Sequence, residues 1–230
     1  MGGDYDLPPT LPQNGVDYIC FTDRQDLHVS PNGWTIRDVD PILPSDTFRS
    51  SREMKTREHR WLADYSGSIY IDSTVHLRKD PQQLWDYLIP DQDVVFGAFF
   101  HSLRDTVAEE FVAVAEAKLD FRHVIDAQMQ AYKTFHPKTL EERLVWGGIL
   151  ARRHNEAACV EAMEVWFSHI LRYSRRDQLS LPLALSSLSR EQRNIRQDDI
   201  FVTDFHQWPV TEKPKPKQSS RCASVFSFNK

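Results

Sequence analysis

The chain has 230 residues, of which 40 % are hydrophobic and 27 % charged, as in an ordinary globular protein long enough to bury a core. Its formal net charge of -5 gives no reason to expect nucleic acid or an anionic membrane as a partner. Cys20, Cys159 and Cys222 are too widely spaced to indicate a disulfide framework or a zinc site, and no apolar run approaches the roughly 18 residues of a membrane span. We therefore expect no transmembrane segment and, from a cysteine pattern typical of a reducing compartment, a cytoplasmic location.

The predicted elements alternate between strands and helices along most of the chain. In chain order they are a strand at 16–23, a helix at 46–65, a strand at 68–72, a helix that begins with Asp80 as its N-cap and Pro81, a strand at 93–101, helices between 105 and 135, a strand at 145–155, a helix at 156–174, a helix that Pro182 bends or restarts, and a strand at 198–205. Such alternation predicts one α/β domain over residues 1–210 with a mainly parallel sheet. Residues 211–230 are rich in Pro, Lys and Ser, which predicts a flexible tail.

Polar residues follow two of the buried strands. Asp72 comes directly after one strand, and Thr22 and Asp23 end another. Because ligands of open α/β sheets bind outside the carboxyl ends of the strands, a carboxylate there is a natural ligand for Mg²⁺ or Mn²⁺, which would bridge a diphosphate. Alternatively, Asp72 caps a turn with Ser73 and Thr74. The spacing supports both interpretations equally.

The helix over 46–65 has a basic face, made of Arg49, Arg52, Lys55 and His59. Arginine offers phosphates a planar fork of donors, and lysine offers them a point charge. On local grounds, however, the pattern favours a solvated helix face paired with Glu53 and Glu58. A phosphate-binding role is the alternative interpretation.

Three further segments allow a structural and a functional interpretation. Gly147 and Gly148 indicate that the backbone approaches either a ligand or another strand closely. Asp177, next to Gln178, is favoured as an N-cap; its alternative role is to bind an acceptor hydroxyl or to act as a base. His206 follows the last predicted strand, where a structural role is favoured over that of metal ligand or phosphate donor.

Six segments occur in an order and spacing that resembles one family. They are "GGDYD" (2–6), "DYICFTD" (17–23), "SSREMKTREHRWLADYSGSIYIDSTVHL" (50–77), "AFFHSLRDTVAEE" (98–110), "GGILARRHN" (147–155) and "YSRRDQLSL" (173–181). Together they are similar to the TOD/MUCI-type glycosyltransferase-like family over about residues 2–205. A more distant similarity, to glycosyltransferase family 8, rests on Arg52, Asp72, Gly147-Gly148, Asp177-Gln178, and His206 with Lys213-Pro214.

The resemblance implies a GT-A fold, a single Rossmann-like domain that holds a nucleoside diphosphate sugar, with UDP the favoured carrier. It implies a glycosyltransferase of polysaccharide biosynthesis that uses Mn²⁺ or Mg²⁺ and a glycan or other hydroxyl acceptor, with the stereochemistry left open. The residues implied by this likeness are Tyr5, Thr22, Asp23, Arg52, Lys55, Asp72, Gly147 and Gly148 for the nucleotide sugar, Asp177 and Gln178 for catalysis, His101, Arg104 and Glu109 for the acceptor, and Asp72 and His206 for the metal.

The sequence departs from the family-8 pattern in two ways. Thr74 stands where that pattern has a second acid, so either Asp72 and His206 suffice for the metal or the basic residues work with little metal. The sequence also opens at the "GGDYD" segment, before which the family has a strand that supports the nucleotide pocket.

Two other functions therefore stay open. One is a non-catalytic module that binds sugar nucleotides or glycans and has lost the second acid. The other, less favoured, is a phosphohydrolase built on Asp72 and "RRHN" (152–155), although such enzymes need more clustered carboxylates and histidines.

Overall fold

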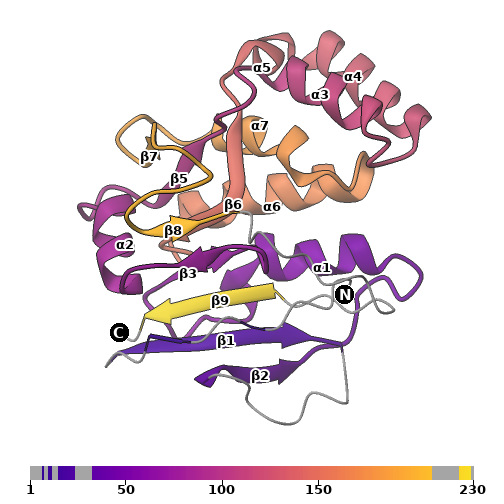
Figure 1. Cartoon of the computed structure of the whole chain (residues 1–230). Helices are drawn as coiled ribbons and strands as arrows, with labels where there is room; N and C mark the ends of the chain where they lie inside the picture. The colour runs from indigo at the N-terminus through magenta and orange to yellow at the C-terminus, as the bar shows by residue number, and fades with distance from the viewer. Residues whose placement is uncertain (1–6, 8–9, 12–14, 24–32, 209–222, 229–230) are drawn as a thin grey trace.

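The computed structural model describes residues 7, 10, 11, 15–23, 33–208 and 223–228, and the architecture below is that of these residues (Figure 1). Seven strands form one sheet in the order β2-β1-β9-β3-β6-β5-β7. These strands are β1 (Val16–Thr22), β2 (Thr35–Asp38), β3 (Gly67–Ile71), β5 (Phe96–Phe100), β6 (Val145–Arg152), β7 (Arg193–Arg196) and β9 (Ala223–Phe228). A separate pair joins β4 (His76–Leu77) to β8 (His206–Gln207).

Helices separate most of these strands along the chain. They are α1 (Thr47–Thr56), η2 (Glu58–Arg60), α2 (Pro81–Leu88), α3 (Val107–Glu116), α4 (Arg122–Phe135), α5 (Pro137–Glu141), α6 (Ala157–Arg172), η3 (Asp177–Leu179) and α7 (Leu181–Leu185). The start of α2 is as the sequence predicts, because Asp80 accepts a hydrogen bond from the backbone N–H of Gln82 and Pro81 opens the helix. No helix in the described ranges is long and apolar enough to cross a bilayer.

The α/β class expected from the sequence is confirmed, with a mixed sheet. Only β1–β2 and β5–β7 pair in parallel, whereas β9 and β6 run antiparallel to both of their neighbours. Strands β1, β2, β3, β5 and β7 therefore all point the same way. Their carboxyl ends meet at one edge of the sheet, where an open α/β sheet binds its ligands.

Side chains of successive strand residues enter two different cores. Tyr70 packs into the cluster that α6 and α7 cover, whereas Ile69 and Ile71 pack into the cluster that holds Leu84 and Trp85 of α2. This alternation has the period of two expected of a strand buried on both faces. The edge formed by the carboxyl ends of the strands thus belongs to a sheet that is packed on both faces.

The C-terminal strand corrects the expected tail. Residues 223–228 form β9 in the middle of the sheet, hydrogen-bonded to β1 on one side and to β3 on the other. Val225 and Phe226 are at most 1 % exposed. The apolar pattern of this short strand stands next to a Pro- and Lys-rich stretch, and that composition dominated the prediction. The rest of the expected tail lies outside the described residues.

Three other predictions need correction. The helix expected over 46–65 ends at Thr56 and gives way to the short η2. The strand expected over 198–205 is absent from that described stretch, which β7 precedes and β8 follows. Cys20 is disulfide-bonded, contrary to the expectation of reduced cysteines, while Cys159 is a free buried thiol. A disulfide removes the cysteine argument for a reducing compartment.

Candidate functional site

The strand register brings the predicted polar residues to one edge. Ser224 of β9 pairs with Cys20 of β1 on one side and with Ile71 of β3 on the other. Thr22 and Asp72 therefore leave the sheet at the same edge, two strand spacings apart, or roughly 10 Å. On the far side of β3, the backbone N–H of Asp72 donates to the carbonyl of Gly148 at 2.9 Å.

A buried ionic cluster lies at this edge. The Nζ atom of Lys55, on α1, is 2.6 Å from Oδ2 of Asp177 and 3.4 Å from Oδ1 of Asp72. Arg52, one helical turn earlier, places its Nε 3.6 Å from the same Asp177 oxygen. The side chains of Lys55 and Asp177 are 4 % and 5 % exposed, while that of Asp72 is 38 % exposed. The basic residues that the local pattern assigned to a solvated face are thus folded inward against acids.

Two neighbours hold Lys55 and Asp72 in place. The hydroxyl of Tyr70 donates to Oδ1 of Asp72 at 2.7 Å, and Lys55 Nζ lies 4.9 Å from the centre of the Tyr70 ring. A Cβ on Gly147 would come within 3.2 Å of Lys55 Nζ, so the missing side chain leaves room for the ammonium. Tyr70 is a member of the site that the sequence interpretation missed.

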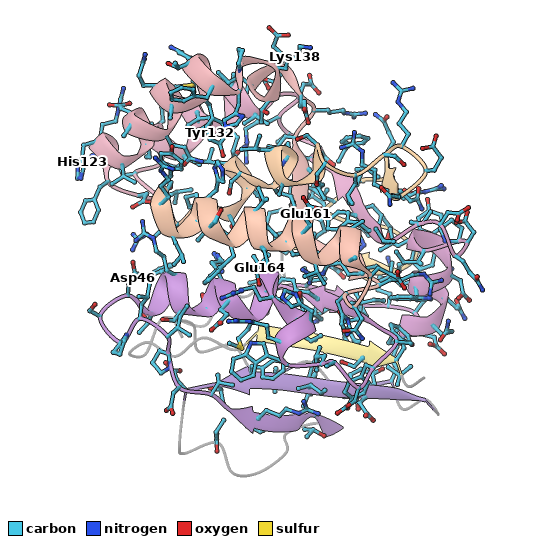
Figure 2. All side chains as sticks on the ribbon, turned by 180° about the vertical axis from the view of Figure 1, so that it is seen from behind. Asp46, His123, Tyr132, Lys138, Glu161 and Glu164 are labelled. Atoms are coloured by element: carbon cyan, nitrogen blue, oxygen red, sulfur yellow. The ribbon has the colours of Figure 1, made fainter. Side chains whose placement is uncertain are left out.

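The other basic residues of the helix have structural partners. Arg49 donates to the carbonyl oxygens of Ile170 and Tyr173, which ties α1 to the end of α6. His59 lies 3.0 Å from Glu164 on α6, on the side of the molecule shown in Figure 2. Only Arg52 and Lys55 of the four basic residues face the Asp177 side.

Charge and burial set the protonation of the cluster. Burial raises the pKa of Asp177, but Arg52, Lys55 and Arg176 outweigh it and lower the pKa. Burial also raises the pKa of Tyr70 well above its usual value, helped by Asp72. Asp177 is therefore ionised at neutral pH and is a poor general base, because its proton affinity is far below that of the groups it would serve. Its geometry fits the positioning of Lys55 and Arg52.

A second polar group extends the cluster toward β5. Arg104 donates to Glu110 on α3, and Gln178 donates to the other oxygen of Glu110 at 3.4 Å. Arg104 also lies 3.0 Å from Nε2 of His101. Burial and the charge of Arg104 lower the pKa of His101 to about 4. Nε of Arg176 is buried without a hydrogen-bond partner among the described residues. Besides Tyr70, the site therefore includes two further residues that the sequence analysis did not select, Glu110 and Arg176.

Glu109, in contrast, does not join this group. It accepts from the backbone N–H of Asp105 at 2.8 Å, while its own N–H donates to Thr106 at 3.2 Å. The bond to Thr106 is the N-cap half of a capping box, which the Thr-x-x-Glu spacing could have revealed, while the carboxylate reaches Asp105, one residue before the N-cap. Glu109 thus contacts the start of its own helix, whereas the neighbouring Glu110 faces the site, and the contact of Glu109 with an acceptor stays a prediction.

The remaining predicted site residues are more distant from the cluster. Thr22 is buried and Asp23 half-buried at the end of β1, and Tyr5 lies outside the described residues. Gly148 faces away from Lys55, toward the ring of Trp146. His206 stacks on Trp146, and its two ring nitrogens lie 2.9 Å from Oγ1 of Thr203 and 3.0 Å from the carbonyl of Ile200. Those contacts use both nitrogens that a metal ion would need.

The donor set does not fit a resident divalent cation. No three His, Cys, Asp or Glu side chains gather into a possible metal site within the described ranges. Asp72 supplies one carboxylate, which already accepts from Tyr70 and lies beside the Lys55 ammonium. Mg²⁺ and Mn²⁺ prefer several oxygen ligands, and a neighbouring ammonium repels them.

A hollow of about 570 Å³ opens beside this site, where β5 and β7 end. His101 and Arg143 line it, together with Asp198, Asp199 and the ring of Phe201. Hydrogen-bonding groups next to an aromatic face suit a ligand rich in hydroxyls. The hollow meets the ionic cluster through His101 and Arg104.

The two glycines of β6 should respond differently to alanine. A Cβ on Gly148 would lie 2.1 Å from the buried Trp146 ring, so we expect Gly148→Ala to lower the free energy of unfolding by about 1–3 kcal/mol. A Cβ on Gly147 would lie 3.2 Å from Nζ of Lys55 and 3.7 Å from Cγ of Gln178, which are looser contacts, so we expect Gly147→Ala to change stability by less than about 1 kcal/mol. Urea unfolding of both variants is the measurement. Equal losses of stability would contradict the conclusion that Gly148 faces the Trp146 ring and Gly147 faces Lys55.

Comparisons with known proteins agree with this architecture. The family model described as TOD1/MUCI70, glycosyltransferase-like domain, matches residues 26–205. No curated protein and no solved structure matches the chain. The matched range contains β3, β6, α1 and η3, which carry the ionic cluster, and it covers well over half of the chain. The chain belongs to the TOD1/MUCI70 family of glycosyltransferase-like domains.

Proposed function

We propose that this domain is a glycosyltransferase that moves a sugar from a nucleoside diphosphate sugar, with UDP the favoured carrier, to a hydroxyl of a glycan or other acceptor in polysaccharide biosynthesis. The observation that carries the proposal is the pair of cations, Lys55 and Arg52, gathered at the carboxyl edge of the sheet around Asp177. Family membership supports glycosyl transfer in general. The edge position supports a nucleotide ligand, because open α/β sheets bind such ligands there.

The chemistry asked of this site is the departure of a nucleoside diphosphate from the anomeric carbon. Negative charge grows on the diphosphate as the bond breaks, so preorganised cations lower the barrier, typically by a few kcal/mol per donor. Lys55 and Arg52 supply such charge, and Asp177 keeps both in position. Arg176, with its buried Nε atom lacking a partner among the described residues, adds a further donor close to Asp177.

The acceptor enters on the other side of Gln178 in this proposal. Gln178 and Arg104 both contact Glu110, and Arg104 reaches His101 at the mouth of the hollow between the ends of β5 and β7. His101 is neutral near pH 7 because its pKa is about 4. The nitrogens of this ring already contact Arg104 and the backbone N–H of Leu103, so the primary amide of Gln178 is the group that can position a sugar hydroxyl without adding charge.

Thermal-shift and calorimetric titrations with UDP-, GDP-, dTDP- and CMP-linked sugars test the proposal. A ligand that binds only the folded state raises the free energy of unfolding by about 2.7 kcal/mol at one hundred times its Kd. We expect one nucleotide class to stabilise the wild-type chain and to lose this effect in Arg52→Ala. Arg122→Ala is the matched control, because Arg122 pairs on the surface with Asp126. No response to any nucleotide would contradict the proposal.

A non-catalytic sugar-nucleotide module is the second candidate, favoured by one observation. The cluster has a single partly exposed acid, Asp72, and the described residues contain no metal-binding group beside it. Product analysis separates the candidates, since a module binds the donor without releasing free nucleoside diphosphate in the presence or absence of acceptors.

A further inference from the structure

We propose that the ammonium of Lys55 takes the place of a divalent cation in this site, so that the diphosphate is neutralised by the chain's own charge. The inference rests on the proposed nucleotide-sugar function and specifies how its leaving group is held. It departs from the Mn²⁺ or Mg²⁺ that the sequence analysis expected.

The position of Lys55 carries the inference. Its Nζ atom bridges two carboxylates from different parts of the chain, at 2.6 Å from Asp177 and 3.4 Å from Asp72. One of these acids, Asp72, is the carboxylate that the sequence analysis assigned to the metal. The bridge is buried, with a Lys55 side chain that is 4 % exposed, so the ammonium occupies the space between the acids.

The surroundings attract positive charge to this point. Two carboxylates and the π face of Tyr70 surround Nζ, and each attracts a cation. Arg52 places a second positive charge 3.6 Å from the Asp177 oxygen that Lys55 contacts. A divalent ion bound at Asp72 would therefore sit beside an ammonium that Asp177 already fixes, and the two like charges would repel.

The same geometry leaves a path for an anion. Asp177 is almost fully buried, whereas the side chain of Asp72 is 38 % exposed, so a phosphate reaches Lys55 from the Asp72 side. It would replace the longer of the two ionic contacts and leave the 2.6 Å contact to Asp177 in place. Lys55 thus keeps an anchoring acid while it binds the diphosphate.

The experiment measures nucleotide and metal binding separately. UDP is titrated into the wild-type chain in EDTA and in Mn²⁺, and Mn²⁺ alone is titrated into the wild type and Lys55→Ala. Lys79→Ala is the matched control, because Lys79 pairs with the exposed Asp204 on the surface. We expect the wild type to bind UDP with less than a threefold change between EDTA and Mn²⁺. We expect Lys55→Ala to lose at least tenfold in UDP affinity and to gain binding of Mn²⁺, because its two carboxylates then lack their bridging cation.

Two results would overturn the inference. If UDP binding disappears in EDTA, a metal ion supplies the positive charge that neutralises the diphosphate; the inference is then wrong and the proposed function is still supported. Unchanged UDP affinity in Lys55→Ala, without Mn²⁺ binding, would remove Lys55 from the phosphate site. If no nucleotide binds under any condition, the proposed function fails and the inference fails with it. Should Lys55→Ala not fold, the comparison of EDTA with Mn²⁺ on the wild type decides alone.

Discussion

Phe226→Ala is expected to lower the free energy of unfolding by about 3–5 kcal/mol, the usual cost of emptying the space of a buried aromatic ring. Phe226 is 1 % exposed in the central strand β9 and packs edge-on against Tyr18 at 4.7 Å between ring centres. It also lies 5.4 Å from the ring centre of Trp34. Urea unfolding followed by tryptophan fluorescence measures the change.

Phe135→Ala is the matched control for this substitution. Phe135 ends α4 with 74 % of its surface exposed, so the same change there is expected to stay within about 0.5 kcal/mol. Equal small effects at both positions would mean that β9 does not belong to the sheet. The pair therefore tests the placement of β9 as well as the size of the effect.

Asp177→Asn is the second substitution with a large expected effect. The variant keeps the shape of the side chain but leaves the buried Lys55 and Arg52 without their shared counter-charge. Loss of one partner of a buried ionic group costs about 3–5 kcal/mol, and we expect a loss of this size in the free energy of unfolding at pH 7. Thermal and urea unfolding measure it.

Asp126→Asn provides the comparison for that prediction. Asp126 pairs with Arg122 one helical turn away, and both side chains are more than half exposed. Such surface pairs contribute about 0.3–0.5 kcal/mol, so Asp126→Asn should have almost no effect.

The effect of Asp177→Asn should also depend on pH. Since folding lowers the pKa of Asp177, the contribution of this residue to the free energy of unfolding is present above the ordinary pKa of an aspartate and is lost as the pH falls below that value. The gap between wild type and Asp177→Asn should accordingly narrow in acid, and a constant gap would contradict the ionic explanation.

Local sequence signals located most elements but not the partners of the charged residues. Asp80 and Pro81 fix the start of α2 through contacts within three residues, so the sequence alone predicts it. Lys55 is different, because the acid that buries it, Asp177, comes from far along the chain. Helical periodicity contains information only on neighbours within the same helix, and it therefore favoured a solvated face for Lys55 and Arg52.

The same limit explains the errors at both ends of the sheet. The Pro- and Lys-rich composition ahead of β9 indicates a tail, and only pairing with β1 and β3 shows that residues 223–228 form a strand. The choice between Glu109 and Glu110 depends on where α3 begins, which Thr106 fixes as N-cap. Likeness to a family grouped Lys55, Asp72 and Gly147 in one site, and the structure brings these three residues together, because such likeness carries information on tertiary structure that spacing lacks.

The central position of β9 has a consequence for biosynthesis. Residues 223–228 leave the ribosome after every other described strand, yet β1 and β3 meet only through them. At about 5–20 residues per second, β7 is complete on the order of seconds before β9 is available. Until then the edges of β1 and β3 are unpaired templates for other chains. The nascent chain is therefore most vulnerable to aggregation just before its synthesis reaches the last strand.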